Sequence, residues 1–457
     1  MGKKFDYDVI VIGSGPAGAS SALYATNNGL KTALIESNKW GGSFLNYSDV
    51  PASALFEFSH LYHKSVRGAV FGLSSSSLRY NYPTAQNWKS SVARRAGANS
   101  KKRFESAKIA CFSGFASFLS PHEIAVKDSI ISASKFIIAT GSKLSYGDIS
   151  GIESATCLTP AEALALPRPP KSVFIVGGGS TGVELANYFA ELGTQVVIAE
   201  LADRILPHEE EETSRLITQY FENSLQIKVL AQSRVVAFEP SSKPGFQRVI
   251  FRRGIQEKAI EVSTIILATG SKPATNISLE NAGVEYSPEG IEVDNYLRTS
   301  TKHIYAAGDC LGRESSTERA SYEGALAIAN AIGKSKTTRN YEGFIRVTNT
   351  FPSIASVGLS EEKCLKSKLK FQKTVLPLTA VPAASTSNFR YGFIKMLVDP
   401  KGRILGGTVV CPKAELVLQE IATAIKNGVT VDQLATTPHI SSSWSDLVRL
   451  AAHKLAK

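Results

Sequence analysis

The chain has 457 residues, of which 43% are hydrophobic and 20% are charged. This length exceeds what one hydrophobic core organises, so the sequence predicts about three domains. It contains no run of about 20 apolar residues, which excludes a membrane-spanning helix. A strand-like stretch begins at Asp8 and leaves no room for a signal peptide, so a cytoplasmic location is expected.

The formal net charge of +11 is spread along the chain. The densest basic stretch, residues 94–103, has no aromatic side chains interleaved with its charges, so nucleic-acid binding is not expected. The charge is interpreted as a solvated face, or as a field that attracts anionic cofactors and substrates. The cysteines are odd in number and widely spaced, which predicts reduced thiols and neither a disulfide framework nor a metal site.

An internal repeat is the most informative feature of the sequence. Residues 8–18 and 172–182 each read as an apolar strand that runs into a glycine-rich turn. Each turn opens a helix of small residues, predicted over 19–28 and 183–192, and a second strand follows over 31–36 and 195–200. The same number of residues separates Gly13 from Glu36 and Gly177 from Glu200. The pattern predicts two β-α-β nucleotide-binding units.

The repeat extends to later segments. Residues 136–143 and 265–272 both contain Ala-Thr-Gly-Ser-Lys at the end of an apolar strand, and a further strand leads to Gly308 and Asp309. The predicted fold is α/β, with two Rossmann-like dinucleotide-binding domains, the second inserted in the first, and a C-terminal α+β domain. The expected boundaries are 1–150 with 272–343, then 151–271, then 344–457. Strands over 393–398 and 404–410 and helices over 414–427 and 445–455 are predicted in the last domain.

The glycines of the first turn have separate mechanical roles. Gly13 makes the tight turn, Gly15 lets the backbone approach a pyrophosphate, and Gly18 lets helix and strand pack closely. The helix that follows offers free N–H groups and the positive end of its dipole to phosphates. Glu36, at the tip of the second strand, is placed to bind a ribose diol. Strand, helix and acid occur at the right spacing twice, which makes a purely structural role improbable.

Glu200 bears on the choice of nucleotide at the second turn. A carboxylate there pairs with a free 2′-hydroxyl and repels a 2′-phosphate, which favours NAD over NADP. Arg204 lies close enough in sequence to weaken that preference, and Glu200 as a solvated strand end is the alternative. Asp309 is interpreted as a hydrogen-bonding partner for the ribitol of a flavin dinucleotide, with a helix N-cap as the alternative.

These motifs, with Gly182-Val-Glu184 and Phe351-Pro-Ser-Ile-Ala-Ser-Val-Gly358, resemble the pyridine nucleotide-disulfide oxidoreductase family, the class I group of dihydrolipoamide dehydrogenase and mercuric reductase. The resemblance covers essentially the whole chain. It implies FAD at the first unit, a nicotinamide nucleotide at the second, and a homodimer formed through the C-terminal domain. The expected cofactor-binding residues are Gly13, Gly15, Pro16, Ala17, Gly18, Glu36, Gly42, Ser43, Thr140, Gly141, Gly308 and Asp309 for FAD, and Gly177, Gly179, Ser180, Thr181, Gly182, Glu200 and Gly270 for NAD(H).

The sequence departs from the family where its redox chemistry is expected. In the segment over 41–53, Phe44 and Asp49 stand at the positions of the two redox cysteines, and Ser53 replaces a lysine. Near the C-terminus, Ser441 stands at the position of the acid–base histidine and Asp446 at that of its orienting glutamate. Thiol–disulfide exchange needs a thiolate and a base, so disulfide reduction through the family's dithiol is not expected.

The expected activity is therefore transfer of hydride from NADH to flavin and then directly to a small-molecule acceptor such as a quinone or a dye. The resemblance implies that Glu184 lies near the nicotinamide, and that Ser180, where the family has Tyr or Val, leaves that site more open. Asp49 and Phe44 are further candidate catalytic residues. The alternative for Asp49 is the N-cap of a helix that begins near Pro51, and the alternative for Phe44 is core filling. A soluble transhydrogenase, or a catalytically degenerate paralogue that keeps FAD for a regulatory or structural role, are the other hypotheses.

Overall fold

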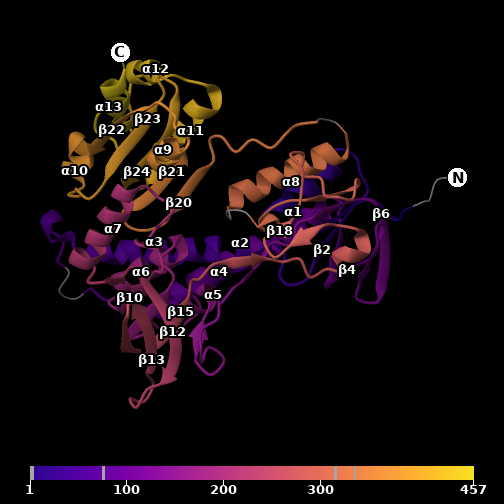
Figure 1. Cartoon of the computed structure of the whole chain (residues 1–457), viewed down its shortest axis with the longest axis horizontal. Helices are drawn as coiled ribbons and strands as arrows, with labels where there is room; N and C mark the ends of the chain where they lie inside the picture. The colour runs from indigo at the N-terminus through magenta and orange to yellow at the C-terminus, as the bar shows by residue number, and fades with distance from the viewer. Residues whose placement is uncertain (1–4, 75–77, 313–315, 334–335, 457) are drawn as a thin grey trace. The chain divides into compact units, whose positions relative to one another are not determined.

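The computed structural model describes residues 5–74, 78–312, 316–333 and 336–456. It divides into unit 1, built from 1–55, 84–145 and 270–341, and unit 2, built from 56–83, 146–269 and 342–457 (Figure 1). Residues 1–4, on which the expectation about a signal peptide partly rests, lie outside the described residues. Among the helices that the structure describes, none is long and apolar enough to cross a bilayer.

Unit 1 is organised around a mixed sheet in the order β3-β2-β1-β6-β5-β4. Strand β19 also pairs with β6, on the edge of β6 away from β1. Strand β1 pairs in parallel with β2 and β6, and β19 pairs in parallel with β6. The strands are β1 (Tyr7–Ile12), β2 (Thr32–Glu36), β3 (Ala110–Ser113), β4 (Ala116–Ser120), β5 (Glu123–Val126), β6 (Ser129–Ile138) and β19 (Ile304–Ala306). The apolar runs of the parallel strands β1, β2 and β19 reflect a sheet that is covered on its faces.

The helices of unit 1 set the geometry of its carboxyl edge. They are α1 (Pro16–Asn27), α2 (Gly42–Asn46), most of α4 (Tyr82–Ser106) and α8 (Thr317–Ala331), with the start of α3 (Asp49–Val66) and the short turns η2 (Leu279–Ala282) and η3 (Asp309–Leu311). Helices α1 and α8 lie side by side (Figure 1) because Gly324 has no side chain: a Cβ there would come within 2.1 Å of the Ala17 carbonyl oxygen.

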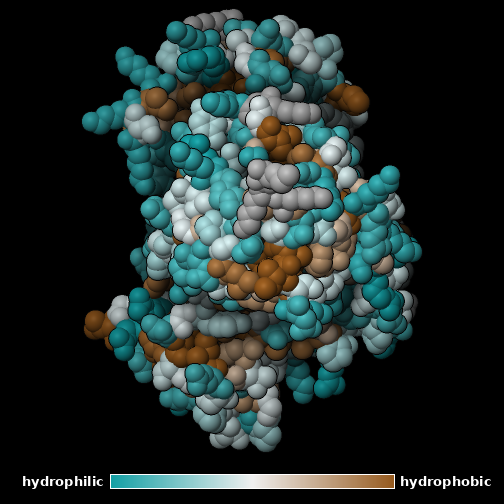
Figure 2. Space-filling view, turned by 90° about the vertical axis from the view of Figure 1, so that its right-hand side faces the viewer, coloured by the Kyte–Doolittle hydropathy of each residue, from teal (hydrophilic) through white to brown (hydrophobic). Residues whose placement is uncertain are grey.

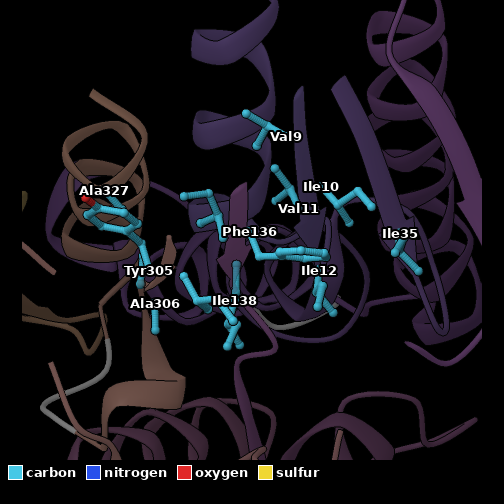
Figure 3. Close-up of a cluster of buried hydrophobic side chains, with 14 of the residues drawn as sticks. Val9, Ile10, Val11, Ile12, Ile35, Phe136, Ile138, Tyr305, Ala306 and Ala327 are labelled. Atoms are coloured by element: carbon cyan, nitrogen blue, oxygen red, sulfur yellow. The ribbon is translucent and has the colours of Figure 1, made fainter. Parts of the chain in front are cut away.

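The core of unit 1 gathers side chains from adjacent strands and α8. Val9 and Val11 of β1, Phe136 of β6 and Ala306 of β19 are completely buried, and Ala327 of α8 joins them (Figure 3). Strand β7 (Ser142–Leu144) pairs antiparallel with β16 (Ser271–Pro273), so the two Ala-Thr-Gly repeats run into one small sheet. The remaining strands of the unit are β17 (Tyr286–Ser287) and β18 (Gly290–Ile291).

Unit 2 contains a second parallel sheet in the order β11-β10-β9-β15-β8 and an antiparallel meander β12-β13-β14. Its strands here are β8 (Cys157–Leu158), β9 (Ser172–Val176), β10 (Gln195–Ala199), β11 (Lys228–Leu230), β12 (Ser233–Pro240), β13 (Gln247–Arg253), β14 (Gln256–Val262) and β15 (Thr264–Leu267). The helices are α5 (Pro160–Ala163), α6 (Ser180–Glu191) and α7 (Glu211–Ser224), with the end of α3 and η1 (Gly68–Phe71).

The C-terminal part of unit 2 is an antiparallel sheet in the order β20-β21-β24-β23-β22, with α11 packed against it. Its strands are β20 (Ile345–Thr348), β21 (Ser353–Gly358), β22 (Gln372–Pro377), β23 (Phe393–Val398) and β24 (Ile404–Cys411). Its helices are α9 (Glu361–Lys366), α10 (Pro382–Thr386), α11 (Ala414–Asn427), α12 (Val431–Thr436) and α13 (Asp446–Leu455), with η4 (Leu378–Ala380).

The predicted fold class is confirmed, because two sheets that each contain a parallel β-α-β unit and a C-terminal α+β part are present. The residues predicted to form the second and third domains fall within one compact unit, and the predicted boundaries themselves stay a prediction. Helix α4 was not predicted. Figure 2 shows a largely hydrophilic face with separate hydrophobic patches; the exposed apolar side chains of unit 1 include Phe115, Leu119 and Ile130.

Candidate functional site

The first glycine-rich turn follows β1 and is shaped by close backbone contacts. Gly13 has φ +104°, and a Cβ there would lie 2.2 Å from the Ala139 carbonyl oxygen. A Cβ on Gly18 would lie 1.7 Å from the Gly13 oxygen, whereas a Cβ on Gly15 would meet nothing within 4 Å. The turn is therefore tightly packed against the backbone at Gly13 and Gly18 and open at Gly15. Pro16 and Ala17 begin α1, whose N-cap Gly15 offers no side-chain cap, so the first N–H groups are available to a phosphate.

Glu36 ends β2 beside this turn and is buried. One carboxylate oxygen accepts hydrogen bonds from the Ser14 backbone N–H at 3.0 Å and the Ser14 hydroxyl at 2.6 Å. The Ser14 hydroxyl in turn accepts a bond from the Gly41 N–H at 2.9 Å. A Cβ on Gly42 would lie 2.7 Å from the Gly15 Cα, so the segment that carries Ser43 also approaches the turn closely.

The carboxyl ends of β6 and β19 lie at the same edge of the sheet as the first glycine turn. After β6, the Thr140 hydroxyl donates to the Ala274 carbonyl oxygen at 2.6 Å, and Gly141 adopts φ +73°. After β19, Gly308 adopts φ +82°. The Asp309 carboxylate accepts a hydrogen bond from the Ser142 hydroxyl at 3.1 Å. Parallel strands place their carboxyl ends at one edge, which is where nucleotides bind in open α/β sheets.

The alternative interpretation of Asp309 as a helix N-cap is wrong. Gly308 is the N-cap of η3, which begins at Asp309, and Ser316 caps α8 through the Arg319 N–H. The Asp309 side chain is instead bonded to Ser142 across the edge of the sheet. The cofactor role predicted for Asp309 stays a prediction.

The second turn repeats this geometry in unit 2. Gly177 has φ +107°, and its Cβ position lies 2.4 Å from the Ala268 oxygen. The Cβ position of Gly182 lies 1.9 Å from the Gly177 oxygen, while that of Gly179 is open. Ser180 and Thr181 are the exposed first residues of α6. Gly270 follows the Ala-Thr sequence of this half with φ +96° and begins the next segment of unit 1.

Glu200 closes the second turn as Glu36 closes the first. Its carboxylate accepts hydrogen bonds from the Gly178 N–H at 2.6 Å and the Ala202 N–H at 2.7 Å. Arg204 is engaged elsewhere: its guanidinium bonds Asp203 and the Pro207 carbonyl and lies 3.6 Å from a Glu362 oxygen. The residue that weakened the predicted preference for NAD therefore has acidic partners of its own.

Glu184 lies in α6, two residues after Gly182, and is partly buried. One of its carboxylate oxygens accepts two hydrogen bonds from Asn349, from the backbone N–H at 2.6 Å and from the side-chain amide at 3.0 Å. On the same helix, the Asn187 side-chain oxygen accepts a bond from the Phe351 N–H at 3.3 Å. Helix α6 thus holds the turn between β20 and β21.

The segment over 41–53 contains no cysteine. Phe44 is half-buried in α2, and Ser53 is exposed. Helix α3 begins at the exposed Asp49, two residues before the predicted start, so Asp49 is a first-turn residue rather than a cap that precedes the helix. Its carboxylate accepts hydrogen bonds from the Ser48 hydroxyl at 2.9 Å and from the Thr317 hydroxyl, at the start of α8, at 3.4 Å.

In the C-terminal segment, the resemblance places an acid–base histidine where this chain has Ser441. Ser441 is exposed. Both ring nitrogens of His439 have partners: Nδ1 lies 2.8 Å from the Thr437 carbonyl oxygen and Nε2 lies 2.9 Å from the Glu420 carboxylate. Asp446 is buried and accepts a hydrogen bond from Arg449 at 2.7 Å. His439 is thus engaged through both ring nitrogens, and Asp446 is held by Arg449.

Three residues of these sites escaped the sequence analysis: Ser14, Glu323 and Asn349. Ser14 occupies a variable position of the glycine fingerprint, so the sequence did not indicate a role for it. Glu323 is a fully buried acid in α8 that accepts bonds from the Gly308 N–H at 2.8 Å and the Arg319 guanidinium at 2.9 Å, and a charged residue on an otherwise small-residue helix face was a usable signal. Asn349 is far from Glu184 in sequence, so only the fold reveals the contact.

Comparisons with known proteins agree with this architecture. Residues 7–324 match the model of the pyridine nucleotide-disulphide oxidoreductase family, and residues 344–452 match that family's dimerisation domain. The chain therefore belongs to the pyridine nucleotide-disulphide oxidoreductase family, whose members are flavoprotein oxidoreductases that bind FAD and a nicotinamide nucleotide. The resemblance stated from the sequence is confirmed.

Individual relatives are similar over nearly the full length. The chain is 31% identical over 439 residues to a mercuric reductase of Bacillus cereus, covering 95% of this chain and 69% of that protein. It is 30% identical over 456 residues to a dihydrolipoyl dehydrogenase of Chlorobaculum parvum, covering 98% and 96%. The structure of LpdA from Mycobacterium tuberculosis superposes with a TM-score of 0.88 at 25% identity, covering 98% of this chain and all of that one (100%).

Both turns fit the dinucleotides of this family. In each turn the second glycine faces open space in front of an uncapped helix N-terminus, and an acidic residue stands at the tip of the next strand. Pyrophosphate and ribose require these groups.

Proposed function

We propose that the chain is an FAD-dependent NADH oxidoreductase that passes electrons from NADH through flavin directly to a non-disulfide small-molecule acceptor of the quinone or dye type. One observation carries the proposal: both nucleotide turns are intact, whereas the segment over 41–53, where the resemblance places the redox cysteines, contains none and has Phe44 and Asp49. Bound FAD would take up hydride from NADH and release electrons to the acceptor. The protein supplies binding, orientation and electrostatics.

The remaining cysteines do not suit disulfide exchange. Cys310 is completely buried, and its thiol donates to the carbonyl oxygens of Ile138 and Ala307. Burial raises the pKa of the Cys310 thiol to about 12 and that of Cys157 to about 11. Burial also raises the pKa of Cys111, Cys364 and Cys411. Because the thiolate is the nucleophile in exchange, thiols that stay protonated near neutral pH react poorly.

The nucleotide in the second turn is proposed to be NADH rather than NADPH. The Glu200 carboxylate, fixed by two backbone N–H groups, matches a ribose diol and would repel a 2′-phosphate. Arg204, the cation that could have accepted that phosphate, is paired with acidic residues. Glu184, in α6 just beyond the glycine turn, is proposed to face the nicotinamide ring.

A homodimer through residues 344–457 is part of the same proposal, supported by the match to the family's dimerisation domain. Light scattering of the purified protein at micromolar concentration should give the mass of two chains. A single-chain mass would remove this part of the proposal without affecting the nucleotide sites.

The deciding experiment is an anaerobic titration of the purified yellow protein with NADH. Flavin absorbance should bleach without a long-wavelength thiolate-to-flavin band, and a benzoquinone or a redox dye should restore it. Oxidised lipoamide, glutathione disulfide and mercuric ion should not restore it. Turnover of a disulfide at a rate comparable to that of the quinone would overturn the proposal, and hydride transfer to a second nucleotide alone would favour a transhydrogenase.

A further inference from the structure

The turn between β20 and β21 contributes a side chain to the nucleotide-binding half of unit 2. We propose that Asn349, in this turn, is a positioning residue that holds the Glu184 carboxylate in place at the nicotinamide end of the site and so strengthens binding of the oxidised nucleotide relative to the reduced one. This inference rests on the proposed function, in which Glu184 faces the nicotinamide ring.

The contact is specific in its geometry. A single oxygen of Glu184, Oε1, accepts both the Asn349 backbone N–H at 2.6 Å and the Asn349 amide N–H at 3.0 Å. Asn349 is exposed and Glu184 only partly buried. An exposed glutamate normally samples many rotamers, so two donors from one residue remove conformational freedom before any ligand arrives.

The donor itself is fixed by its surroundings. The Phe351 N–H donates to the Asn187 side-chain oxygen at 3.3 Å, and the Thr350 hydroxyl donates to the Pro352 carbonyl at 2.6 Å. The Phe351 ring lies 5.0 Å from the ring of Phe389. The turn is thus tied to α6 at two points, at Glu184 and at Asn187, which lie one helical turn apart on the same face.

The negative charge of Glu184 would distinguish the oxidised from the reduced nicotinamide. The oxidised nicotinamide ring carries a positive charge and the reduced ring is neutral. A carboxylate held beside the ring therefore attracts the oxidised form selectively, whereas a mobile one is screened by water. A backbone N–H and an amide N–H are donors only, so they hold the carboxylate as an acceptor.

The test uses the FAD-loaded protein and three probes in isothermal titration: NAD⁺, tetrahydro-NADH, which has a neutral ring and cannot give hydride, and ADP-ribose, which has no ring. Asn349→Leu keeps the size of the side chain and the backbone donor but removes the side-chain N–H donor to Glu184. It should weaken NAD⁺ binding about three- to tenfold, as expected for one hydrogen bond to a charged group. Binding of the other two probes should change less than about twofold.

Two controls separate positioning from a structural effect. In a Glu184→Gln background, Asn349→Leu should have no further effect on NAD⁺, because the two residues act as one unit. Asn427→Ala removes another side-chain amide, which bonds the Thr423 carbonyl in α11, and should leave all three affinities unchanged. Asn349→Ala serves if the leucine variant does not fold, as judged by circular dichroism and FAD content.

The inference is overturned if all three probes weaken together, if NAD⁺ binding is unchanged, or if the effect persists in the Glu184→Gln background. These outcomes are distinct from failure of the proposed function. If the proposed function fails, NADH does not bleach the flavin of the parent protein. The affinities of the parent and of Asn349→Leu for NAD⁺ and ADP-ribose can still be measured and compared.

Discussion

The carboxylate of Glu36 holds Ser14 by two hydrogen bonds, one to the backbone N–H at 3.0 Å and one to the hydroxyl at 2.6 Å. Because the Ser14 hydroxyl also accepts the Gly41 N–H, one buried side chain links the tip of β2, the glycine turn and the segment that leads into α2. The first turn is thereby shaped before FAD binds, and the cost of ordering it on binding is reduced.

Ser14→Ala should lower both the stability of the protein and its affinity for FAD. The variant removes the acceptor of the Gly41 N–H and one of the two donors to the Glu36 oxygen, which keeps only the Ser14 backbone N–H, and this costs about 1–3 kcal/mol of unfolding free energy. FAD should dissociate about tenfold more readily. Thermal unfolding and recovery of flavin fluorescence measure the two effects. Ser65→Ala, which removes an exposed hydroxyl bonded within α3, is the control and should change neither.

The glycines separate binding from folding. Gly15→Val and Gly179→Val place side chains in open space, so both proteins should fold, but each side chain occupies the position of a pyrophosphate. The first should purify colourless, and the second should stay yellow but resist bleaching by NADH. Gly18→Ala, whose Cβ would lie 1.7 Å from the Gly13 oxygen, should instead fail to fold. A Gly179→Val protein that NADH still reduces would mean that the nucleotide binds elsewhere.

Glu200 should control the choice of nucleotide. The parent protein should reduce its flavin faster with NADH than with NADPH, since the carboxylate disfavours a 2′-phosphate. In Glu200→Gln the negative charge is lost while the acceptor oxygen remains for the Gly178 N–H, so the preference should fall by about tenfold. Stopped-flow bleaching with each nucleotide measures this ratio. A parent protein that prefers NADPH tenfold or more would contradict the role assigned to Glu200.

A buried lysine links the two parts of unit 2. Lys395 in β23 is almost completely buried, and its ammonium lies 2.9 Å from Glu210 and Glu212 and 2.6 Å from Glu361. Lys395→Met would leave these carboxylates without their shared cation and should destabilise the protein by about 3–5 kcal/mol. Lys373→Met removes a half-exposed partner of Glu361 and should cost less than about 1 kcal/mol. Chemical denaturation measures both.

The same cluster predicts the pH range in which it stabilises the fold. Burial works against the charged form of Glu361, but hydrogen bonds from Lys373 and Lys395 outweigh it and lower the pKa of this carboxyl. Burial likewise opposes the charged form of Lys395, yet its bonds to Glu361, Glu210 and Glu212 raise its pKa. The stabilisation is therefore lost as pH falls through the lowered carboxyl pKa and as it rises through the raised lysine pKa. Lys395→Met should flatten both limbs of the stability profile.

The sequence predicted what depends on local pattern and missed what depends on distant contacts. Both glycine turns, their strands and α11 follow from spacing and apolar periodicity, and they appear where expected. Helix α4 was missed because its residues are mostly polar and show no apolar stripe. The bonds of Asn349 to Glu184 join segments far apart in the chain, so no spacing rule could reveal them.

Asp49, at the position of a redox cysteine of the family, offers the sharpest test of the chemistry. Its exposed carboxylate accepts bonds from Ser48 and from Thr317 in the first turn of α8, and the positive end of that helix dipole favours a negative charge there. If Asp49 lies beside the flavin, as proposed, its negative charge disfavours the anionic reduced form of the flavin. Asp49→Asn keeps the size of the side chain and removes the charge.

In Asp49→Asn, reduction by NADH should persist, while the flavin potential rises or the acceptor step slows. Photoreduction against a reference dye gives the potential, and stopped-flow reoxidation by a quinone gives the acceptor rate. Asp128→Asn, an exposed aspartate on the turn between β5 and β6, is the matched control and should behave as the parent. Phe44→Ala tests the neighbouring position: if Phe44 stacks on a flat acceptor, the KM for the quinone should rise while bleaching by NADH is unchanged. If the potential and the acceptor rate of Asp49→Asn both match those of the parent across the neutral pH range, Asp49 serves only the first turn of α3.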